Sequence, residues 1–327
     1  MTNKFSILEA EIGQRLDKVL TQRFPATTRS QWQKLIKQGL ILVNNIIVTP
    51  HHFLRIGSEI SLLPAKPLTP PKKITTKKLV ALIPEIIFEN KDYLIINKPS
   101  GLLVHPTTRK EKNTLVAWLK KKYPKATKTF LASRRLDSEE KKRPGIVHRL
   151  DAEVSGLMVI AKTIEMYHSL KEQFANRQIN KNYLALVYGV ITKDEDIIAL
   201  AIGRSTSQGR MAAHTQTADK DREAKTEYWV LKRFINNTLL KVKIYTGRTH
   251  QIRAHLQAIG YPIVGDPLYR PKKDTFHDSR KKIKIKNDLM RPFLHSTTLG
   301  FSDLAGHWQE YNNNLPPELA DYLKKLR

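Results

Sequence analysis

Between residues 13 and 64, apolar positions first repeat at the spacing of helices. One set recurs every three or four residues and stops before Pro25: Leu16, Val19, Leu20 and Phe24. A second set has the same spacing, with Thr28 or Ser30 as a candidate cap and Gly39 as its end: Trp32, Leu35 and Ile36. The pattern therefore predicts two short amphipathic helices.

The spacing then changes to that of strands. Apolar runs at 40–43 and 46–48 flank Asn44 and Asn45, a pair that favours a hairpin turn, and 60–63 is a further strand candidate. Residues 13–64 are thus expected to form a small αα-β domain.

Residues 65–78 differ in composition from both sides. They hold three prolines and five lysines without an acidic residue, which predicts an extended, self-repelling linker. A second domain is expected to occupy residues 79–327.

Strand patterns dominate this second domain, at 93–97, 157–161, 183–188, 227–232 and 239–245. In the last of these, apolar residues alternate with Lys241 and Lys243, which indicates one buried and one basic face. Because strands and helices do not alternate regularly, we expect an α+β fold with a mixed, mainly antiparallel sheet rather than a doubly wound one.

The excess of basic residues indicates the class of molecule that the protein binds. The chain has 327 residues, and 57 Lys and Arg against 30 Asp and Glu give a formal net charge of +27, which favours a polyanion such as RNA. There is no cysteine and no run of 18 apolar residues, so we expect a cytoplasmic protein without disulfides, thiolate metal sites or a membrane anchor. We also expect a monomer.

One segment stands out as a candidate for chemistry. It runs from Arg143 through His148, Arg149 and Asp151 to Gly156, and a short apolar strand follows. Nearby positive charge would keep the aspartate ionised, and an ionised carboxylate can act as nucleophile, base or ligand. Capping of a turn is the alternative role for a single aspartate in such a place.

The sequence His-Arg-Leu-Asp at 148–151, followed by Ser-Gly-Leu at 155–157, resembles the signature of RluA-type pseudouridine synthases. Four further blocks resemble the same family: 92–106, 181–189, 246–256 with 259–269, and 291–301. The strings Arg15-Leu-Asp17 and 39–45 resemble an S4-type RNA-binding domain. The resemblance implies an RNA-modifying isomerase in which Asp151 is the catalytic carboxylate. A protein kinase is disfavoured, since the chain lacks an Asp-Phe-Gly triplet and a glycine-rich phosphate loop.

Pseudouridine formation breaks the N1–C1′ bond of a uridine and joins C5 to C1′, so neither a redox cofactor nor ATP is needed, and no cofactor is expected. Asp151 could act as nucleophile or as base at the sugar. Arg248 is the expected cationic partner of Asp151, with Arg253 as the alternative. By the resemblance, Tyr183 lies beside the flipped base, where its ring could stack and its hydroxyl could relay the C5 proton.

His148 and Arg149 are expected to orient the loop or to contact the RNA backbone. No metal site is expected, because His250 and His255 are five residues apart and do not face one point. Val154 stands where the family usually has a threonine, so a hydroxyl that could cap the Asp151 turn is missing.

In the first domain, four basic residues are candidate RNA contacts, although they could also form an ordinary solvated face: Arg15, Arg29, Lys34 and Lys37. The expected substrate is large-subunit ribosomal RNA, with transfer RNA as the alternative. A non-catalytic RNA-binding protein of the same fold and a nucleoside-cleaving glycosylase, which would need Glu153 as a second carboxylate, are the competing functions.

Overall fold

The computed structural model describes residues 3–50, 52–54, 56–63, 82–107, 111–205, 210–214, 221–269 and 289–326. By its internal contacts the chain divides into two units, Met1–Leu79 and Val80–Arg327. The linker expected at 65–78 lies outside the described residues. So does the segment 270–286, which holds eight Lys and Arg and could contact the RNA backbone or form a plain solvated loop.

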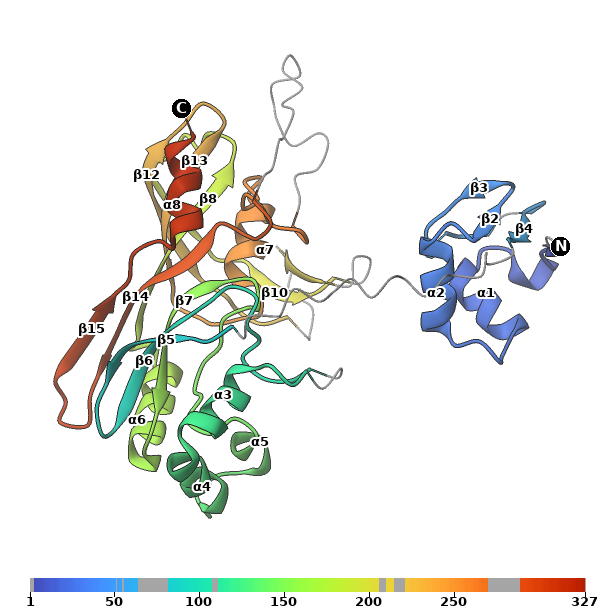
Figure 1. Ribbon diagram of the computed structural model, residues 1–327. Coiled ribbons are helices and arrows are strands. Elements are labelled where there is room, and N and C mark those ends of the chain that lie inside the picture. The colour runs from blue at the N-terminus through green and yellow to red at the C-terminus, as the bar shows by residue number, and fades with distance from the viewer. Residues whose placement is uncertain are drawn as a thin grey trace. The chain divides into compact units, whose positions relative to one another are not determined.

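The first unit packs two helices against a small antiparallel sheet (Figure 1). Its elements are β1 (Asn3–Ser6), a 3₁₀ helix (Glu9–Glu11), α1 (Leu16–Arg23), α2 (Arg29–Lys37), β2 (Ile41–Val43), β3 (Ile46–Ile47) and β4 (Glu59–Leu62). The strand order is β1-β4-β2-β3. Thr28 caps α2 by accepting a hydrogen bond from the backbone N–H of Gln31. Asn44 and Asn45 both have positive φ, 51° and 62°, as the predicted hairpin requires.

The second unit contains a nine-stranded sheet and a separate two-stranded ribbon. The strands are β5 (Glu85–Glu89), β6 (Tyr93–Lys98), β7 (Ser155–Ala161), β8 (Asn180–Tyr188), β9 (Glu195–Ile198), β10 (Ala201–Arg204), β11 (Met211–His214), β12 (Thr226–Arg233), β13 (Asn237–Ile244), β14 (Leu294–Ser302) and β15 (Trp308–Asn312). The helices are α3 (Leu115–Lys122), α4 (Pro124–Ala132), α5 (Ser138–Lys141), α6 (Ile164–Ala175), α7 (Gln251–Ala258) and α8 (Pro317–Lys324).

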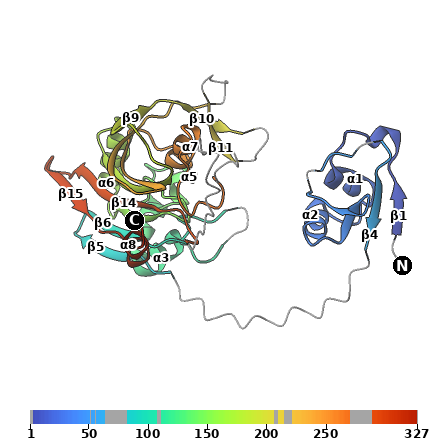
Figure 2. The ribbon, with the colours of Figure 1, turned by 90° about the horizontal axis from the view of Figure 1, so that it is seen from above.

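The order in the large sheet is β5-β6-β7-β14-β8-β13-β12-β9, with β15 paired to β14, while β10 and β11 form the ribbon (Figures 1 and 2). Among the described strands, β7 and β14 run parallel and every other neighbouring pair is antiparallel. The predicted α+β class with a mixed, mainly antiparallel sheet is confirmed.

Both faces of the β6–β7 region are buried. One set of side chains packs with α6, and the set that alternates with it packs with α3: Tyr93, Ile95, Leu157, Val159 and Ala161, and Leu94, Ile96, Met158 and Ile160, respectively. This explains the near-continuous apolar runs of these strands, because successive side chains point to opposite faces of a sheet. A strand held on both faces is a rigid support for the loop that precedes β7.

The strand register brings the start of β7 close to the middle of β8, with β14 between them. Ser296 in β14 pairs with Gly156 in β7 on one side and with Tyr183 in β8 on the other. Gly156 has φ +122°, and a Cβ built there would lie 2.3 Å from the carbonyl oxygen of Ser296. A glycine is therefore required where β7 approaches β14. The Asp151 turn, five residues before Gly156, lies near the middle of β8 as a result.

Candidate active site

Asp151 lies in a turn that the segment after β6 holds in place. The buried ammonium of Lys98 donates to the carbonyl oxygens of Pro99, Leu102 and Ala152 at 3.0, 2.8 and 3.1 Å. The N–H of Gly101 also donates to the oxygen of Ala152, at 2.7 Å. Burial and the charge of Arg291 lower the pKa of Lys98 to about 7. These contacts fix the backbone directly beside Asp151.

The turn is also closed from within. The N–H of Val154 donates to the carbonyl oxygen of Asp151 at 3.2 Å, and the Val154 side chain is buried in the core. This backbone hydrogen bond and the contacts of Lys98 therefore restrain the turn in place of the hydroxyl that Val154 lacks.

The cation that binds Asp151 is Arg253, the third residue of α7. Its Nη1 donates to Oδ2 of Asp151 at 3.0 Å, while Nε and Nη2 donate to the two carboxylate oxygens of Asp266 at 2.6 and 2.9 Å. Arg253 is only 2% exposed. Burial alone would raise the pKa of Asp266, but the hydrogen bonds and charge of Arg253 outweigh it and lower that pKa. One guanidinium thus bridges a buried structural carboxylate and the candidate catalytic one.

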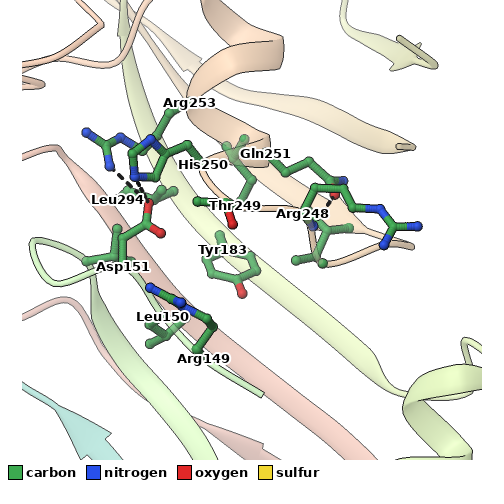
Figure 3. A pocket seen from close by; sticks show the side chains of 14 residues that line it. Arg149, Leu150, Asp151, Tyr183, Arg248, Thr249, His250, Gln251, Arg253 and Leu294 are labelled. Atoms are coloured by element: carbon green, nitrogen blue, oxygen red, sulfur yellow. Dashed lines mark hydrogen bonds and ion pairs between the residues drawn. The ribbon is translucent and has the colours of Figure 1, made fainter. Parts of the chain in front are cut away.

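The expectation that Arg248 makes this contact is wrong. Its Nε donates to the carbonyl oxygen of Glu223 at 3.1 Å, and its side chain points away from Asp151 (Figure 3). Arg248 precedes α7, whereas Arg253 lies on the buried side of the first turns of that helix. Arg248 still lines the pocket that contains Asp151.

Tyr183 lies in the same pocket, on the central strand β8 (Figure 3). It is 6% exposed, and burial together with the negative charge of Asp151 raises its pKa. The phenol is therefore protonated at neutral pH, with its ring on a wall of the pocket. The pocket has a free volume of about 80 Å³, and its lining also includes Leu294, Thr249 and His250.

His250 approaches Asp151 from the start of α7. Its Nε2 lies 3.8 Å from Oδ2 of Asp151, and its Nδ1 lies 3.1 Å from the hydroxyl oxygen of Tyr269. Tyr269 donates its own proton to the carbonyl oxygen of Met211 at 2.8 Å, so Nδ1 of His250 must donate to Tyr269. Burial lowers the pKa of His250. The neutral ring then presents the lone pair of Nε2 toward the pocket.

Backbone geometry supports a functional position for His250, because it has the left-handed conformation, φ 56° and ψ 23°. From the sequence, His250 was considered only as a possible metal ligand paired with His255, and its place beside Asp151 was not predicted. His255 is instead fully buried, and it forms hydrogen bonds with the hydroxyl of Thr226 and with the carbonyl oxygen of Leu200. Within the described residues, no group of three or more His, Asp or Glu side chains is placed to hold a metal ion.

His148 and Arg149 precede Asp151 in the same loop, and Arg149 also lines the Asp151 pocket. Nε2 of His148 accepts a hydrogen bond from the N–H of Val159 at 3.1 Å, and the ring stacks on Phe174. Burial lowers the pKa of His148 to about 3, so it is a neutral residue that ties the loop to β7. Arg149 is exposed, with Nη1 3.4 Å from Nε2 of His105.

In the first unit, Arg15 and Arg29 converge on Asp17, which is fully buried. Arg15 binds both carboxylate oxygens, Arg29 binds Oδ2 at 3.1 Å, and Gln33 donates to Oδ2 at 2.6 Å. Burial opposes ionisation, but these partners lower the pKa of Asp17 to about 2. Arg29 and Gln33 of α2 therefore join this helix to Asp17 of α1, and both arginines keep part of their surface in solvent. The other two candidate RNA contacts are exposed on α2: Lys34 and Lys37.

Comparison with known proteins gives the same family and the same first domain as the sequence motifs do. The sequence profile of the RNA pseudouridylate synthase family matches residues 92–258, and that of the S4 domain matches residues 14–60. An uncharacterized RNA pseudouridine synthase of Bacillus subtilis is 31% identical over 325 residues, covering 98% of this chain and 96% of the relative. Ribosomal large subunit pseudouridine synthase D of Pseudomonas aeruginosa is 37% identical over 317 residues, covering 96% and 92%.

Among solved structures, human RNA pseudouridylate synthase domain containing 4 matches with a TM-score of 0.55 and 25% identity, over 74% of this chain and 94% of that one. Fold, pocket and relatives together define an RNA-modifying isomerase that carries an S4 domain. The chain belongs to the RNA pseudouridylate synthase family, and the resemblance to RluA-type enzymes is confirmed. In the described part of the chain, no helix is long and apolar enough to cross a membrane.

Proposed function

We propose that this enzyme converts specific uridines of large-subunit ribosomal RNA to pseudouridine, with Asp151 as the catalytic carboxylate. The observation that carries the proposal is the contact between Asp151 and Arg253 in a pocket walled by Tyr183. The buried guanidinium of Arg253 supplies a counter-charge to the carboxylate when a bound nucleotide excludes water. The name of the Pseudomonas aeruginosa relative supports the choice of RNA.

The pocket has groups for each step of the reaction. The target base must leave its stack, and a planar phenol ring such as that of Tyr183 can receive it. The N1–C1′ bond then breaks with help from Asp151, as nucleophile at C1′ or as base at the sugar. The uracil turns and C5 bonds to C1′. The C5 proton leaves to solvent, for which the hydroxyl of Tyr183 is the proposed relay, and N1 takes up one proton from solvent. Atoms and charge balance without an added reactant.

The proposed substrate can be tested by mapping pseudouridines in a strain that lacks the gene, by carbodiimide modification and primer extension. We expect specific sites in large-subunit RNA to be lost and to return with the wild-type gene. If pseudouridines are lost only from transfer RNA, then transfer RNA and not ribosomal RNA is the substrate. Release of free uracil from RNA by the purified enzyme would instead indicate a glycosylase.

The first unit is proposed to bind RNA through Arg15, Arg29, Lys34 and Lys37. Deleting residues 1–78 is expected to weaken RNA binding while a minimal stem-loop is still isomerised. Each lost contact with a single-stranded phosphate should reduce the slope of log K against log salt by about 0.7. Filter binding between low and moderate salt measures this slope.

A double substitution in the first unit serves as the comparison for the deletion. Lys34→Gln combined with Lys37→Gln removes two exposed charges and leaves the Asp17 cluster intact. It should lose part of the same slope and keep the same melting temperature. A slope unchanged in both proteins would mean that the first unit does not contact RNA.

His250 is proposed to bind the 2′-hydroxyl of the target ribose. Nε2 of His250 and Oδ2 of Asp151 lie 3.8 Å apart and both accept hydrogen bonds, so a hydroxyl that enters the pocket beside them can donate its proton to His250. His250→Asn tolerates positive φ and removes Nε2. We expect the rate on RNA to fall about tenfold, as for a lost hydrogen bond of roughly 1.4 kcal/mol.

A substrate with 2′-deoxyuridine at the target position provides the control for this variant. Wild-type enzyme should distinguish ribose from deoxyribose by about tenfold more than His250→Asn does, since each change removes the same contact. Equal discrimination by the two proteins would assign His250 a purely structural role.

A further inference from the structure

A second cavity adjoins the one that contains Asp151, and nothing in the proposed reaction uses it. It is the larger of the two, with a free volume of about 350 Å³. The two cavities share Arg149, Tyr183, Ile244 and Gly247 as lining residues. A nucleotide in the Asp151 pocket would therefore have this cavity directly beside it.

The lining of this cavity is basic. Arg143, Arg149 and Lys181 contribute three cations, and His105 and His148 add two imidazoles, while no Asp or Glu is among its lining residues. Within the part of the chain that the structure describes, none of these three cations forms a salt bridge. The buried arginines elsewhere in this unit do, Arg253 with Asp266 and Arg291 with Glu318.

Lys181 is the most informative of the three. It is only 8% exposed, and its ammonium lies 4.9 Å from the centre of the Phe174 ring. Burial lowers its pKa to about 8, so it is still mainly protonated at neutral pH. A buried charge without a counter-charge lowers the stability of the fold, and an anionic ligand would remove that penalty on binding.

We propose that this cavity binds a phosphodiester group of the RNA backbone next to the target uridine, with Lys181 and Arg143 as its main ligands. The inference rests on the proposed function, since it needs an RNA strand that enters the Asp151 pocket. The positive lining attracts the single negative charge of a phosphodiester, and its several N–H donors suit the acceptor oxygens of that group. The shared wall of Tyr183 and Arg149 limits the bound group to the neighbourhood of the flipped nucleotide.

Charge removal at Lys181 is the direct test. Lys181→Met keeps the length of the side chain and its contact with Phe174 but has no charge. We expect the affinity for a substrate stem-loop to fall about tenfold, the range of one charged hydrogen bond. The salt slope should fall by about 0.7. Lys193→Met is the matched control, because Lys193 is exposed and paired with Asp196, and it should bind RNA as the wild type does.

A chemical change in the RNA identifies the group that is bound. A methylphosphonate on one side of the target uridine removes a single phosphate charge. We expect it to weaken wild-type binding about tenfold at one of the two flanking positions and to cause no further loss in Lys181→Met, because both changes remove the same contact. Arg143→Gln, on a half-buried residue, gives a second variant for the same cycle if Lys181→Met does not fold.

Additive losses at both flanking phosphates would overturn the proposal, as would unchanged affinity and salt slope in both variants. These outcomes are distinct from failure of the proposed function. The stem-loop is chosen as one that the wild-type enzyme isomerises in vitro, so the binding cycle does not depend on which cellular RNA is the natural substrate.

Discussion

Asp151→Asn should stop pseudouridine formation, with a loss of about 10⁴-fold or more in single-turnover rate. Asparagine has the same shape and can still accept the hydrogen bond from Arg253, but it lacks the charge needed by a nucleophile or a base. RNA affinity and melting temperature should change little. Tritium release from RNA labelled at C5 of uridine measures the rate, because C5 loses its hydrogen in the reaction.

Glu153→Gln is the matched control for this variant. Glu153 is two residues from Asp151 and its Oε2 lies 3.7 Å from Nη1 of Arg253, yet its side chain is 45% exposed. We expect its loss to lower the rate less than tenfold, since an exposed ion pair contributes little. Full activity in Asp151→Asn, or an inactive Glu153→Gln, would assign the chemistry to a different carboxylate.

Replacing Arg253 should affect both stability and rate. Arg253→Met leaves the buried carboxylate of Asp266 without its bidentate partner, which is expected to lower the free energy of unfolding by about 3–5 kcal/mol. Asp151 also loses its cation, so the rate should fall at least about 100-fold in the protein that remains folded. Urea unfolding and single-turnover kinetics at low temperature separate the two effects.

Arg248→Met provides the comparison, because Arg248 binds a backbone carbonyl and not a buried carboxylate. It should unfold within about 1 kcal/mol of the wild type. Its rate should change far less than that of Arg253→Met. A stable and active Arg253→Met, or an equal loss of rate in Arg248→Met, would contradict the assignment made from the structure.

Local patterns were sufficient for most of the secondary structure. The pair Asn44-Asn45 predicts a turn with two positive φ values, and the apolar run at 157–161 lies within β7, because both depend on residues close in sequence. β1 was not predicted, since Asn3–Ser6 is too short to show an alternation and is stabilised by pairing with β4. The parallel pairing of β7 with β14 joins segments about 140 residues apart and leaves no local signal.

The candidate site was predicted only in part, because sequence patterns indicate single residues but not the contacts between distant segments. The motif indicates Asp151 as the candidate catalytic residue. The choice between Arg248 and Arg253, by contrast, depends on how α7 is oriented toward a turn about 100 residues earlier in the chain. The same limit applies to Asp266 and to Lys98, whose roles follow from contacts between distant segments. Tyr183 remains a predicted participant, and the structure adds that it lies in the pocket with Asp151.

The position of β14 has a consequence for biosynthesis. This strand lies between β7 and β8 in the sheet, although the ribosome makes it more than 100 residues after either of them. Until residues 294–302 leave the exit tunnel, β7 and β8 have unpaired edges and the segments with Asp151 and Tyr183 are not joined. We therefore expect the nascent catalytic unit to stay open during most of its synthesis, and its active site to form late, in a step that closes a long loop.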